Sequence, residues 1–262
     1  MTLSNFQFNT TPGLRFGSGL ARSSCKEIFD KLGSRILFIT DKGLMSLGLT
    51  KPTIEELKKM GSVEVFDDVE ADPSQKTLLT AIELGRKIKA TGVIGFGGGS
   101  SMDVAKLSAL ILGSNEDLEK AWGVSNAKGP RLPLALIPTT AGTGSEVTPI
   151  SIITVGEEEK KGVSSSLILP DLAILDPDLT LGLPASTTAS TGIDAMVHAI
   201  EGYASSNKNN NPISKMLAIE ALKLLGGSIE QAVFDGSNAV SYTHLRAHET
   251  REDRGWGGLG EK

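Results

Sequence analysis

A short apolar run that ends in three glycines constrains the fold of this chain more than any other stretch. Residues 93–96 have the pattern of a buried strand, Gly97-Gly98-Gly99-Ser100-Ser101 follows directly, and a helical pattern then continues to residue 111. A strand that passes through glycines into a helix is typical of a parallel α/β unit. The exposed N–H groups and positive dipole at such a helix start favour a bound phosphate. The junction therefore predicts a parallel sheet with an anion site at the end of one strand.

Other apolar runs repeat this alternation up to about residue 140. Residues 36–40, 63–66 and 134–137 also have the pattern of buried strands, and helical patterns cover residues 20–32 and 53–60. Strands that alternate with helices indicate a doubly wound parallel sheet.

A further helix is expected to begin at Asp72-Pro73. Asp72 is a suitable N-cap, Pro73 fits the first helical position, and Gln75 can complete a capping box. Gly92 is the expected C-terminal stop of this helix.

The pattern changes after residue 146. Residues 147–155 and 163–169 are expected to form an extended pair around a charged turn at residues 157–161. Residues 173–175 then form one more expected strand.

Beyond this strand the sequence predicts helices alone, at residues 192–204 and 213–225. We therefore expect a nucleotide-binding α/β domain over residues 1–184 and the beginning of an all-helical domain over residues 185–240. Residues 241–262 show little apolar periodicity and end in a glycine-rich stretch. They resemble a translated sequencing-adapter tail, so we expect a non-native tail and a truncated helical domain; a native disordered tail is the alternative.

Composition narrows the class of partner and the compartment. The 262-residue chain is 39% apolar and 22% charged with a net charge of -5, which indicates neither a nucleic-acid nor a membrane-surface partner. No apolar run approaches the ~20 residues of a membrane span, and the N-terminus lacks the regions of a signal peptide. The single cysteine, Cys25, fits a reducing compartment. We expect a cytoplasmic protein.

Two features at the ends of expected strands suit a dinucleotide. Gly95-x-Gly97-x-x-Ser100 approaches the dinucleotide fingerprint but has serine in place of the third glycine, so a tight structural turn is the alternative. Asp41 follows the strand at 36–40 and can accept hydrogen bonds from a ribose diol. Its carboxylate would repel a 2′-phosphate, which favours NAD over NADP, and a helix N-cap is the alternative.

A polar loop follows the strand at residues 134–137. The hydroxyls of Thr139-Thr140 and of Thr143-Gly144-Ser145 suit the sugar and phosphates of a nucleotide, although a capping loop would have the same composition. Lys161, in the charged turn, is either a cofactor contact or a solvated lysine, and its surroundings favour solvent.

Asp194 and His198 form the clearest candidate metal pair. They lie four residues apart in a helical pattern, so both side chains project from one face. A carboxylate with a neutral imidazole suits Fe²⁺ or Zn²⁺, but a catalytic metal needs at least three protein ligands. A hydrogen bond between the two side chains is the alternative. His244 and His248 repeat the spacing within the suspected tail.

Four motifs taken together are more specific than any one of them. They are Gly97-Gly-Gly-Ser-Ser-Met-Asp103-Val-Ala-Lys106, Ile137-Pro-Thr-Thr-Ala-Gly-Thr-Gly-Ser-Glu-Val-Thr148, Leu169-Pro-Asp-Leu-Ala-Ile-Leu-Asp-Pro-Asp178 and Thr191-Gly-Ile-Asp-Ala-Met-Val-His-Ala-Ile-Glu-Gly-Tyr203. In order and spacing they resemble the iron-containing (group III) alcohol dehydrogenase family over residues 6–240. The resemblance implies a Rossmann-like NAD-binding domain followed by a helical metal-binding domain, in a dehydroquinate synthase-like architecture.

The same resemblance implies roles for individual residues. Asp41 would contact the adenosine ribose, while the pyrophosphate and the rest of the dinucleotide would be held by Gly98, Gly99, Ser100, Ser101, Thr139, Thr140, Thr148 and Lys161. Asp194 and His198 would be the first two ligands of Fe²⁺, or of Zn²⁺, which accepts the same ligands. The family's two further histidines belong to later helices, in a segment that this sequence does not contain.

The implied activity is hydride transfer between NAD and a small alcohol or aldehyde, assisted by the metal as a Lewis acid. The missing ligands are expected to impair it. A homodimer is implied by the resemblance alone. Two alternatives are a metal-free enzyme similar to maleylacetate reductase, which Asp194 and His198 argue against, and a nucleotide-binding remnant without turnover.

Overall fold

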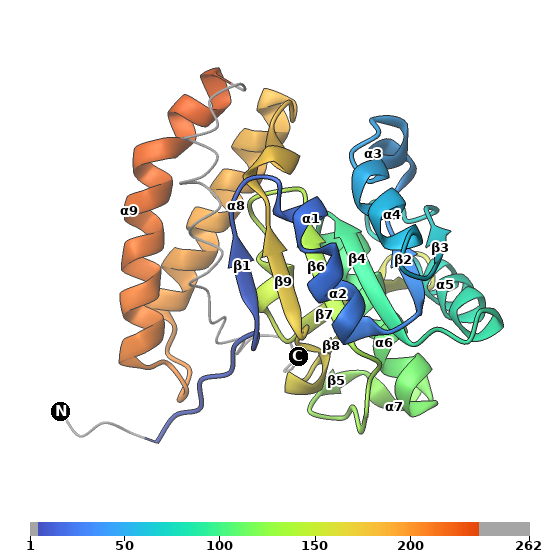
Figure 1. Ribbon diagram of the computed structural model, residues 1–262. Coiled ribbons are helices and arrows are strands. Elements are labelled where there is room, and N and C mark those ends of the chain that lie inside the picture. Colours follow the sequence, from blue (N-terminus) through green and yellow to red (C-terminus); the bar gives the residue numbers. More distant parts are fainter. Residues whose placement is uncertain (1–4, 236–262) are drawn as a thin grey trace.

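The computed structural model describes residues 5–235 and contains a layered α/β part beside a pair of long helices (Figure 1). Within these residues the central sheet has six strands in the order β1-β9-β6-β4-β2-β3, and every neighbouring pair is parallel. The strands are β1 (Leu14–Phe16), β9 (Leu172–Leu175), β6 (Leu134–Pro138), β4 (Gly92–Gly97), β2 (Arg35–Ile39) and β3 (Ser62–Phe66). The predicted Rossmann-like parallel sheet is confirmed.

The strand order reverses at β2. From β2 the chain first adds β3 on one side and then returns to add β4 on the other side. In a doubly wound sheet the crevice that receives a ligand opens at such a reversal, outside the carboxyl ends of the strands. The carboxyl ends of β2 and β4 therefore border the expected ligand crevice.

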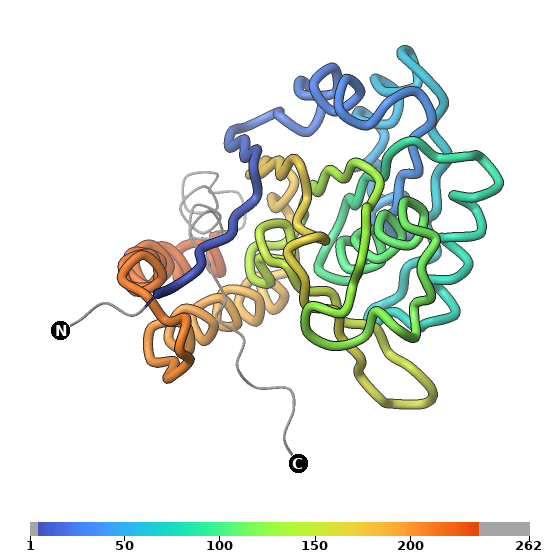
Figure 2. The backbone as a smooth tube through the Cα atoms, turned by 90° about the horizontal axis from the view of Figure 1, so that it is seen from below, coloured from blue at the N-terminus to red at the C-terminus, as the bar shows by residue number. Residues whose placement is uncertain are grey.

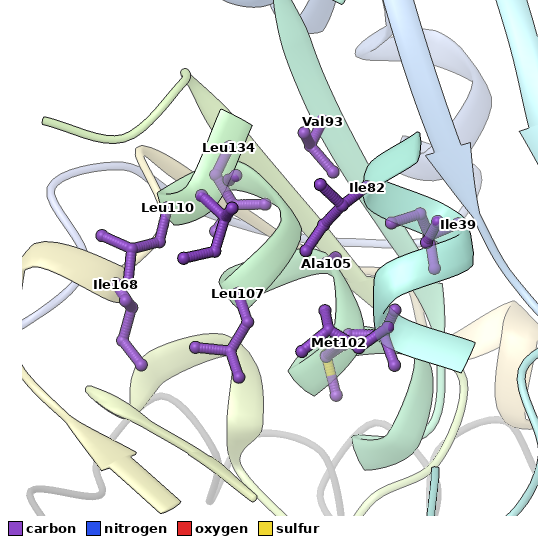
Figure 3. Packing of buried hydrophobic residues seen from close by; sticks show 14 of the residues in the cluster. Ile39, Ile82, Val93, Met102, Ala105, Leu107, Leu110, Leu134 and Ile168 are labelled. Atoms are coloured by element: carbon purple, nitrogen blue, oxygen red, sulfur yellow. The ribbon is translucent and has the colours of Figure 1, made fainter. Parts of the chain in front are cut away.

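Helices cover both faces of the sheet because the central strands are apolar on both sides (Figure 1). One face packs against α1 (Leu20–Ser23), α2 (Cys25–Leu32) and α4 (Lys51–Lys58), and the other against α5 (Gln75–Lys87) and α6 (Gly99–Ser114). Figure 3 shows the apolar core on the face of the sheet that α5 and α6 cover, to which Leu107 and Leu110 of α6 belong. Each such buried leucine stabilises the fold by about 1.5–3 kcal/mol, so the sheet fixes α6 firmly.

The start of α5 differs from the prediction. Ser74 is the N-cap, and its Oγ accepts a hydrogen bond from the N–H of Thr77 at 3.2 Å. Asp72 instead takes a left-handed conformation with φ 54° and pairs with Lys160 at 2.6 Å. The predicted Asp72 cap is therefore wrong, because the chain turns once more after Asp72 before the helix begins.

Gly92 does not end α5. The helix ends at Lys87, and Gly92 is the first residue of β4. A Cβ at Gly92 would lie 2.5 Å from the Cβ of Leu32, so glycine is required there by the close packing of α2 on β4. The predicted helix over residues 20–32 is also divided, into α1 and α2, at Ser24.

The predicted extended pair after residue 146 is present, but its first strand is shorter than expected and its second begins at Glu159, within the predicted turn, and not at residue 163. β7 (Ile150–Val155) and β8 (Glu159–Ser164) pair antiparallel, and β5 (Gly123–Val124) adds to β8. The expected strand ends are instead the 3-10 turns η1 (Ser145–Val147) and η2 (Ser166–Ile168). Among the described strands and α-helices, four escaped prediction because each is too short to show a periodicity: β1, β5, α3 (Lys42–Ser46) and α7 (Leu118–Ala121).

The two long helices α8 (Ala185–Ala204) and α9 (Pro212–Phe234) confirm the predicted helical segments and extend both (Figure 2). They pack against each other, and Asn211 caps α9 by accepting from the N–H groups of Ile213 and Ser214. The N-terminal segment is joined to the loop between them by two hydrogen bonds between Gln7 and Asn209, of 2.7 and 2.8 Å. In residues 5–235 every helix falls short of the length and apolarity needed to cross a bilayer.

Asp171, directly before β9, joins the start of that strand to the loop before β6. Its Oδ2 accepts from the Arg131 guanidinium at 2.6 Å and from the Leu134 N–H at 2.8 Å. Burial pushes the pKa of the Asp171 carboxyl upward, but these hydrogen bonds outweigh burial and hold the pKa below its ordinary value. The ionised carboxylate is therefore favoured in the folded state.

This lowered pKa makes part of the stability depend on pH. A carboxyl whose folded pKa lies below its unfolded value of about 3.9 contributes stability above that pH and loses the contribution as pH falls further. We expect Asp171→Asn to reduce the unfolding free energy at pH 7 by about 1 kcal/mol or less, because the carboxylate is partly exposed. Urea unfolding at pH 7 and pH 3 should show the difference shrinking at the lower pH. E157Q, in the exposed turn after β7, controls for the loss of one charge, and a difference independent of pH would contradict this account.

Candidate functional site

The glycine turn after β4 forms the centre of the candidate site. Gly97 has φ 152°, and its carbonyl accepts from the N–H of Thr139 at 2.9 Å, which joins the ends of β4 and β6. Gly98 is the N-cap of α6 and Gly99 its first residue, with no side-chain cap on the helix N–H groups. Ser100 and Ser101 complete the first turn. The turn places a helix N-terminus at the carboxyl edge of the sheet, where a phosphate is favoured.

Gly98 differs from its neighbours in the space around it. A Cβ at Gly98 would meet no atom closer than Oγ1 of Thr140, at 3.7 Å, and the backbone is extended. A Cβ at Gly99 would lie 3.0 Å from Thr143, and one at Gly95 would lie 2.7 Å from Ala105. Packing therefore explains glycine at 95 and 99 but not at 98. The close approach of a ligand to the backbone does explain it.

The loop after β6 lies across the same turn. Thr139 and Thr148 are buried at its two ends, and Thr140 is partly exposed. Gly144 takes the left-handed conformation that lets the chain enter η1. Thr139 and Thr140 are thus brought to the glycine turn by the pairing of β6 with β4, while Thr148 lies at the far end of the loop, where its cofactor contact stays a prediction.

Asp41 lies at the carboxyl end of β2, one strand from the glycine turn. Its Oδ1 accepts from the N–H of Leu44 at 2.9 Å, so the helix N-cap weighed as an alternative is present. The backbones of Asp68 and Asp41 form an isolated antiparallel β-bridge, and the Asp68 carboxylate forms an ion pair with Lys42. The hydrogen bond to Asp68 raises the pKa of Lys42. A cap occupies one carboxylate oxygen and is compatible with a ribose on the other.

Lys161 lies elsewhere than predicted. It belongs to β8, not to the turn of the hairpin, and its Nζ is 3.9 Å from a carboxylate oxygen of Glu119 on α7. The side chain is partly exposed. The surface pairing agrees with the solvent interpretation of this residue, and a cofactor contact stays a prediction.

Asp194 and His198 project from one face of α8. His198 Nε2 lies 3.4 Å from Asp194 Oδ1, and the two side chains are 21% and 46% exposed respectively. They are therefore reachable from solvent. Carboxylate oxygen and imidazole nitrogen are donors that Fe²⁺ and Zn²⁺ accept, so the pair fits two positions of such a site.

Within residues 5–235 no group of three or more His, Cys, Asp and Glu side chains is arranged to hold a metal. His244 and His248 lie outside the described residues, as do the predictions for residues 241–262. The pair on α8 therefore supplies two candidate donors, and its role in a metal site stays a prediction.

The loop after β6 also connects the glycine turn to α8. A Cβ at Gly142 would lie 2.6 Å from the carbonyl oxygen of Thr191, so loop and helix are in backbone contact. Ala141 is buried in one cluster with Ala195, which adjoins Asp194. One short loop therefore fixes the position of α8 relative to the proposed phosphate site.

Sequence reasoning overlooked the roles of three other motif residues. Asp176 is buried and accepts from the N–H groups of Gly19 and Ala21, at 3.1 and 2.9 Å, which holds the start of α1. On α6, Asp103 accepts a hydrogen bond from Ser145 in the loop after β6, and Lys106 donates to the carbonyl of Ile150 just beyond that loop. Their charge and helical spacing were the only signals in the sequence.

The fold and these residues define a Rossmann-like α/β protein with an attached helical part. The chain belongs to the iron-containing alcohol dehydrogenase family. The family profile described as "Iron-containing alcohol dehydrogenase" matches residues 12–177, and the profile for the C-terminal part of the family matches residues 188–247.

Individual relatives agree with this assignment. The chain is 36% identical to sulfoacetaldehyde reductase of Bilophila wadsworthia, over 90% of the chain and 61% of the relative. It is 42% identical to long-chain-alcohol dehydrogenase 1 of Geobacillus thermodenitrificans, over 79% and 53%. An alcohol dehydrogenase from Oenococcus oeni has a similar structure, with a TM-score of 0.89 and 32% identity, over 94% of this chain and 65% of that one. The chain spans 53% to 63% of the length of the first two of these relatives and of six further curated ones.

Proposed function

We propose that this chain is an NAD-dependent oxidoreductase that interconverts a small alcohol and its aldehyde. The activity is assisted by Fe²⁺, or by Zn²⁺, at Asp194 and His198. Family membership supports the reaction class, since relatives carry names such as 1,3-propanediol dehydrogenase and sulfoacetaldehyde reductase. A solved relative from Bifidobacterium kashiwanohense is described as a complex with NAD⁺, which supports the cofactor.

One observation carries the proposal: the turn at Gly98, the end of β2 and the loop after β6 meet at the reversal of the strand order, and that loop contacts α8. In this arrangement the N–H groups of α6 bind the pyrophosphate, with Ser100 and Ser101 beside them. Asp41 accepts hydrogen bonds from the ribose. Thr139, Thr140, Thr148 and Lys161 are proposed to orient the rest of the dinucleotide.

Two groups from outside the chain supply the chemistry. Bound NAD would accept or donate the hydride, and a bound metal ion would act as a Lewis acid toward the substrate oxygen. Asp194 and His198 would hold the ion, and Ala141 and Gly142 set the distance of α8 from the cofactor. We propose residues 1–184 as the NAD-binding domain and 185–240 as part of the metal-binding domain.

A second candidate is nucleotide binding without turnover. The number of metal donors favours this second candidate. Residues 5–235 bring together only two, whereas a catalytic metal needs at least three protein ligands. Both candidates require NADH binding, so a fluorescence titration of the 262-residue chain with NADH tests what they share. Saturable binding is expected, and its absence would contradict both.

The choice of NAD over NADP is proposed to depend on Asp41. We expect Asp41→Ser to improve NADPH binding by about tenfold or more relative to NADH, because removal of the carboxylate removes repulsion of the 2′-phosphate. Serine keeps an N-cap for α3, so stability should change little. Parallel titrations of both nucleotides measure the ratio.

Asp67→Ser, at a partly buried position directly after β3, serves as the matched control. An unchanged NADH to NADPH ratio in the Asp41→Ser variant would remove Asp41 from this role. An equal shift in both variants would show that total surface charge, and not position 41, sets the preference.

A further inference from the structure

A fully buried lysine lies in the middle of α6. Lys106 has no solvent-exposed area, although it belongs to the helix that begins at the glycine turn. Burying an ammonium group costs several kcal/mol unless its N–H groups find partners. An apolar side chain would fill this position at lower cost, so the charge needs an explanation.

The partners of Lys106 lie in one segment of the chain. Its Nζ donates to Oγ of Ser145 at 2.8 Å and to the carbonyl of Ile150 at 2.7 Å. Asp103, one turn earlier on α6, lies 3.9 Å from the same Nζ and accepts from Ser145 Oγ at 2.7 Å. Its second oxygen accepts from the N–H of Ile152 at 2.9 Å. Two adjacent turns of α6 therefore hold the chain from residue 145 to residue 152.

This segment is the exit of the loop that begins at Thr139. The entry of the loop is fixed to the glycine turn by the bond from Thr139 N–H to Gly97. The exit at Ser145 is fixed to α6 by Lys106 and Asp103. The second attachment therefore holds the far end of the loop that carries the threonines and contacts α8 at Gly142, together with the hydrogen bond from Thr11 Oγ1 to the carbonyl of Glu146 at 3.1 Å.

We propose that Lys106 and Asp103 are positioning residues of the dinucleotide site, which hold the loop at 139–148 against the N-terminal half of α6. Neither residue needs to touch the cofactor. The proposal rests on the proposed NAD site and adds the residues that preorganise it. Preorganisation matters because a loop that must be ordered on binding lowers the affinity for the ligand.

The test compares NADH affinity with stability in three variants of the full chain. Lys106→Met removes the charge at similar length, and Ser145→Ala breaks the link between Lys106 and Asp103. Leu110→Ala is the matched control, because Leu110 is a buried residue of the same helix that takes no part in these bonds. It is expected to lower the midpoint of urea unfolding, because it leaves a cavity in the core, while binding NADH within twofold of the native chain.

We expect Lys106→Met to bind NADH at least tenfold more weakly and Ser145→Ala about fivefold more weakly. Hydrogen exchange should accelerate at least tenfold in residues 139–150 of Ser145→Ala and stay unchanged in α5. Binding within twofold in a folded Lys106→Met variant would overturn the proposal. If that variant does not fold, unchanged exchange and unchanged affinity in Ser145→Ala would overturn it. Failure of the native chain to bind NADH would instead overturn the proposed function.

Discussion

Replacing Gly98 with valine is expected to weaken NADH binding at least ~100-fold and to change the unfolding free energy by no more than about 1 kcal/mol. The free protein has room for the added Cβ, which would lie 3.7 Å or more from its nearest neighbours. The extended backbone, with φ −77° and ψ −173°, suits a β-branched residue. Valine is a poorer N-cap than glycine, which sets the limit on stability.

The loss of affinity has a separate cause. The valine methyl groups would occupy the space that the pyrophosphate needs to reach the N–H groups of α6. Losing two charge-assisted hydrogen bonds of about 1.5–3 kcal/mol each accounts for a factor of 100 or more. NADH titration and urea unfolding measure the two quantities on the same sample.

Gly95→Val is the matched control for this experiment. A Cβ there would lie 2.7 Å from both Ala105 and Leu136, so this variant is expected to lose stability in the absence of any ligand. The two glycines therefore separate binding from packing. If Gly98→Val binds NADH as the native chain does, the phosphate does not lie at the start of α6.

Replacing His198 with alanine is expected to lower the affinity for Fe²⁺ or Zn²⁺ at least ~100-fold, because loss of one direct ligand exceeds the 10–100-fold effect typical of an indirect one. Asp194→Asn should lower it similarly. The side chains lie 3.4 Å apart on one face of α8, so both variants remove a donor from the same point. Anaerobic calorimetry with each metal alone measures the change, and native affinity should fall at acidic pH as histidine becomes protonated.

Glu201→Gln is the matched control, since Glu201 is an exposed carboxylate of α8 outside the pair. It is expected to leave metal affinity unchanged. If His198→Ala and Asp194→Asn bind metal as well as the native chain, the pair is a hydrogen bond within the helix and not part of a metal site.

The sequence predicted the elements whose periodicity is local. β2, β4 and β6 were found because each is a short apolar run buried on both sides, and the glycine turn was found because it interrupts strand and helix together. Asp72 shows the limit of such reasoning. It has the composition of a helix cap, but its bond to Lys160, 88 residues later, belongs to a turn.

The candidate site shows the same division. Its glycines and threonines follow strands that parallel pairing must bring together, so their meeting was predictable. The attachment of Lys106 to Ser145 and Ile150 could not be predicted, because these two partners follow Lys106 by 39 and 44 positions in the sequence. A buried lysine cannot be told from a solvated one by helical spacing alone. The close contact of Gly142 with the backbone of Thr191 could not be predicted either, because the two residues lie far apart in the sequence.

The central claim is metal-assisted hydride transfer from a cofactor held at the glycine turn. The most direct test incubates the 262-residue chain with Fe²⁺, NADH deuterated at C4 and a short aliphatic aldehyde. The deuteride would pass from C4 to the carbonyl carbon while a proton goes to the oxygen, giving a deuterated alcohol and NAD⁺. Our account predicts deuterium at C1 of the alcohol, lost on metal removal and in His198→Ala. Saturable NADH binding without deuterium transfer, with either Fe²⁺ or Zn²⁺ present, would contradict it.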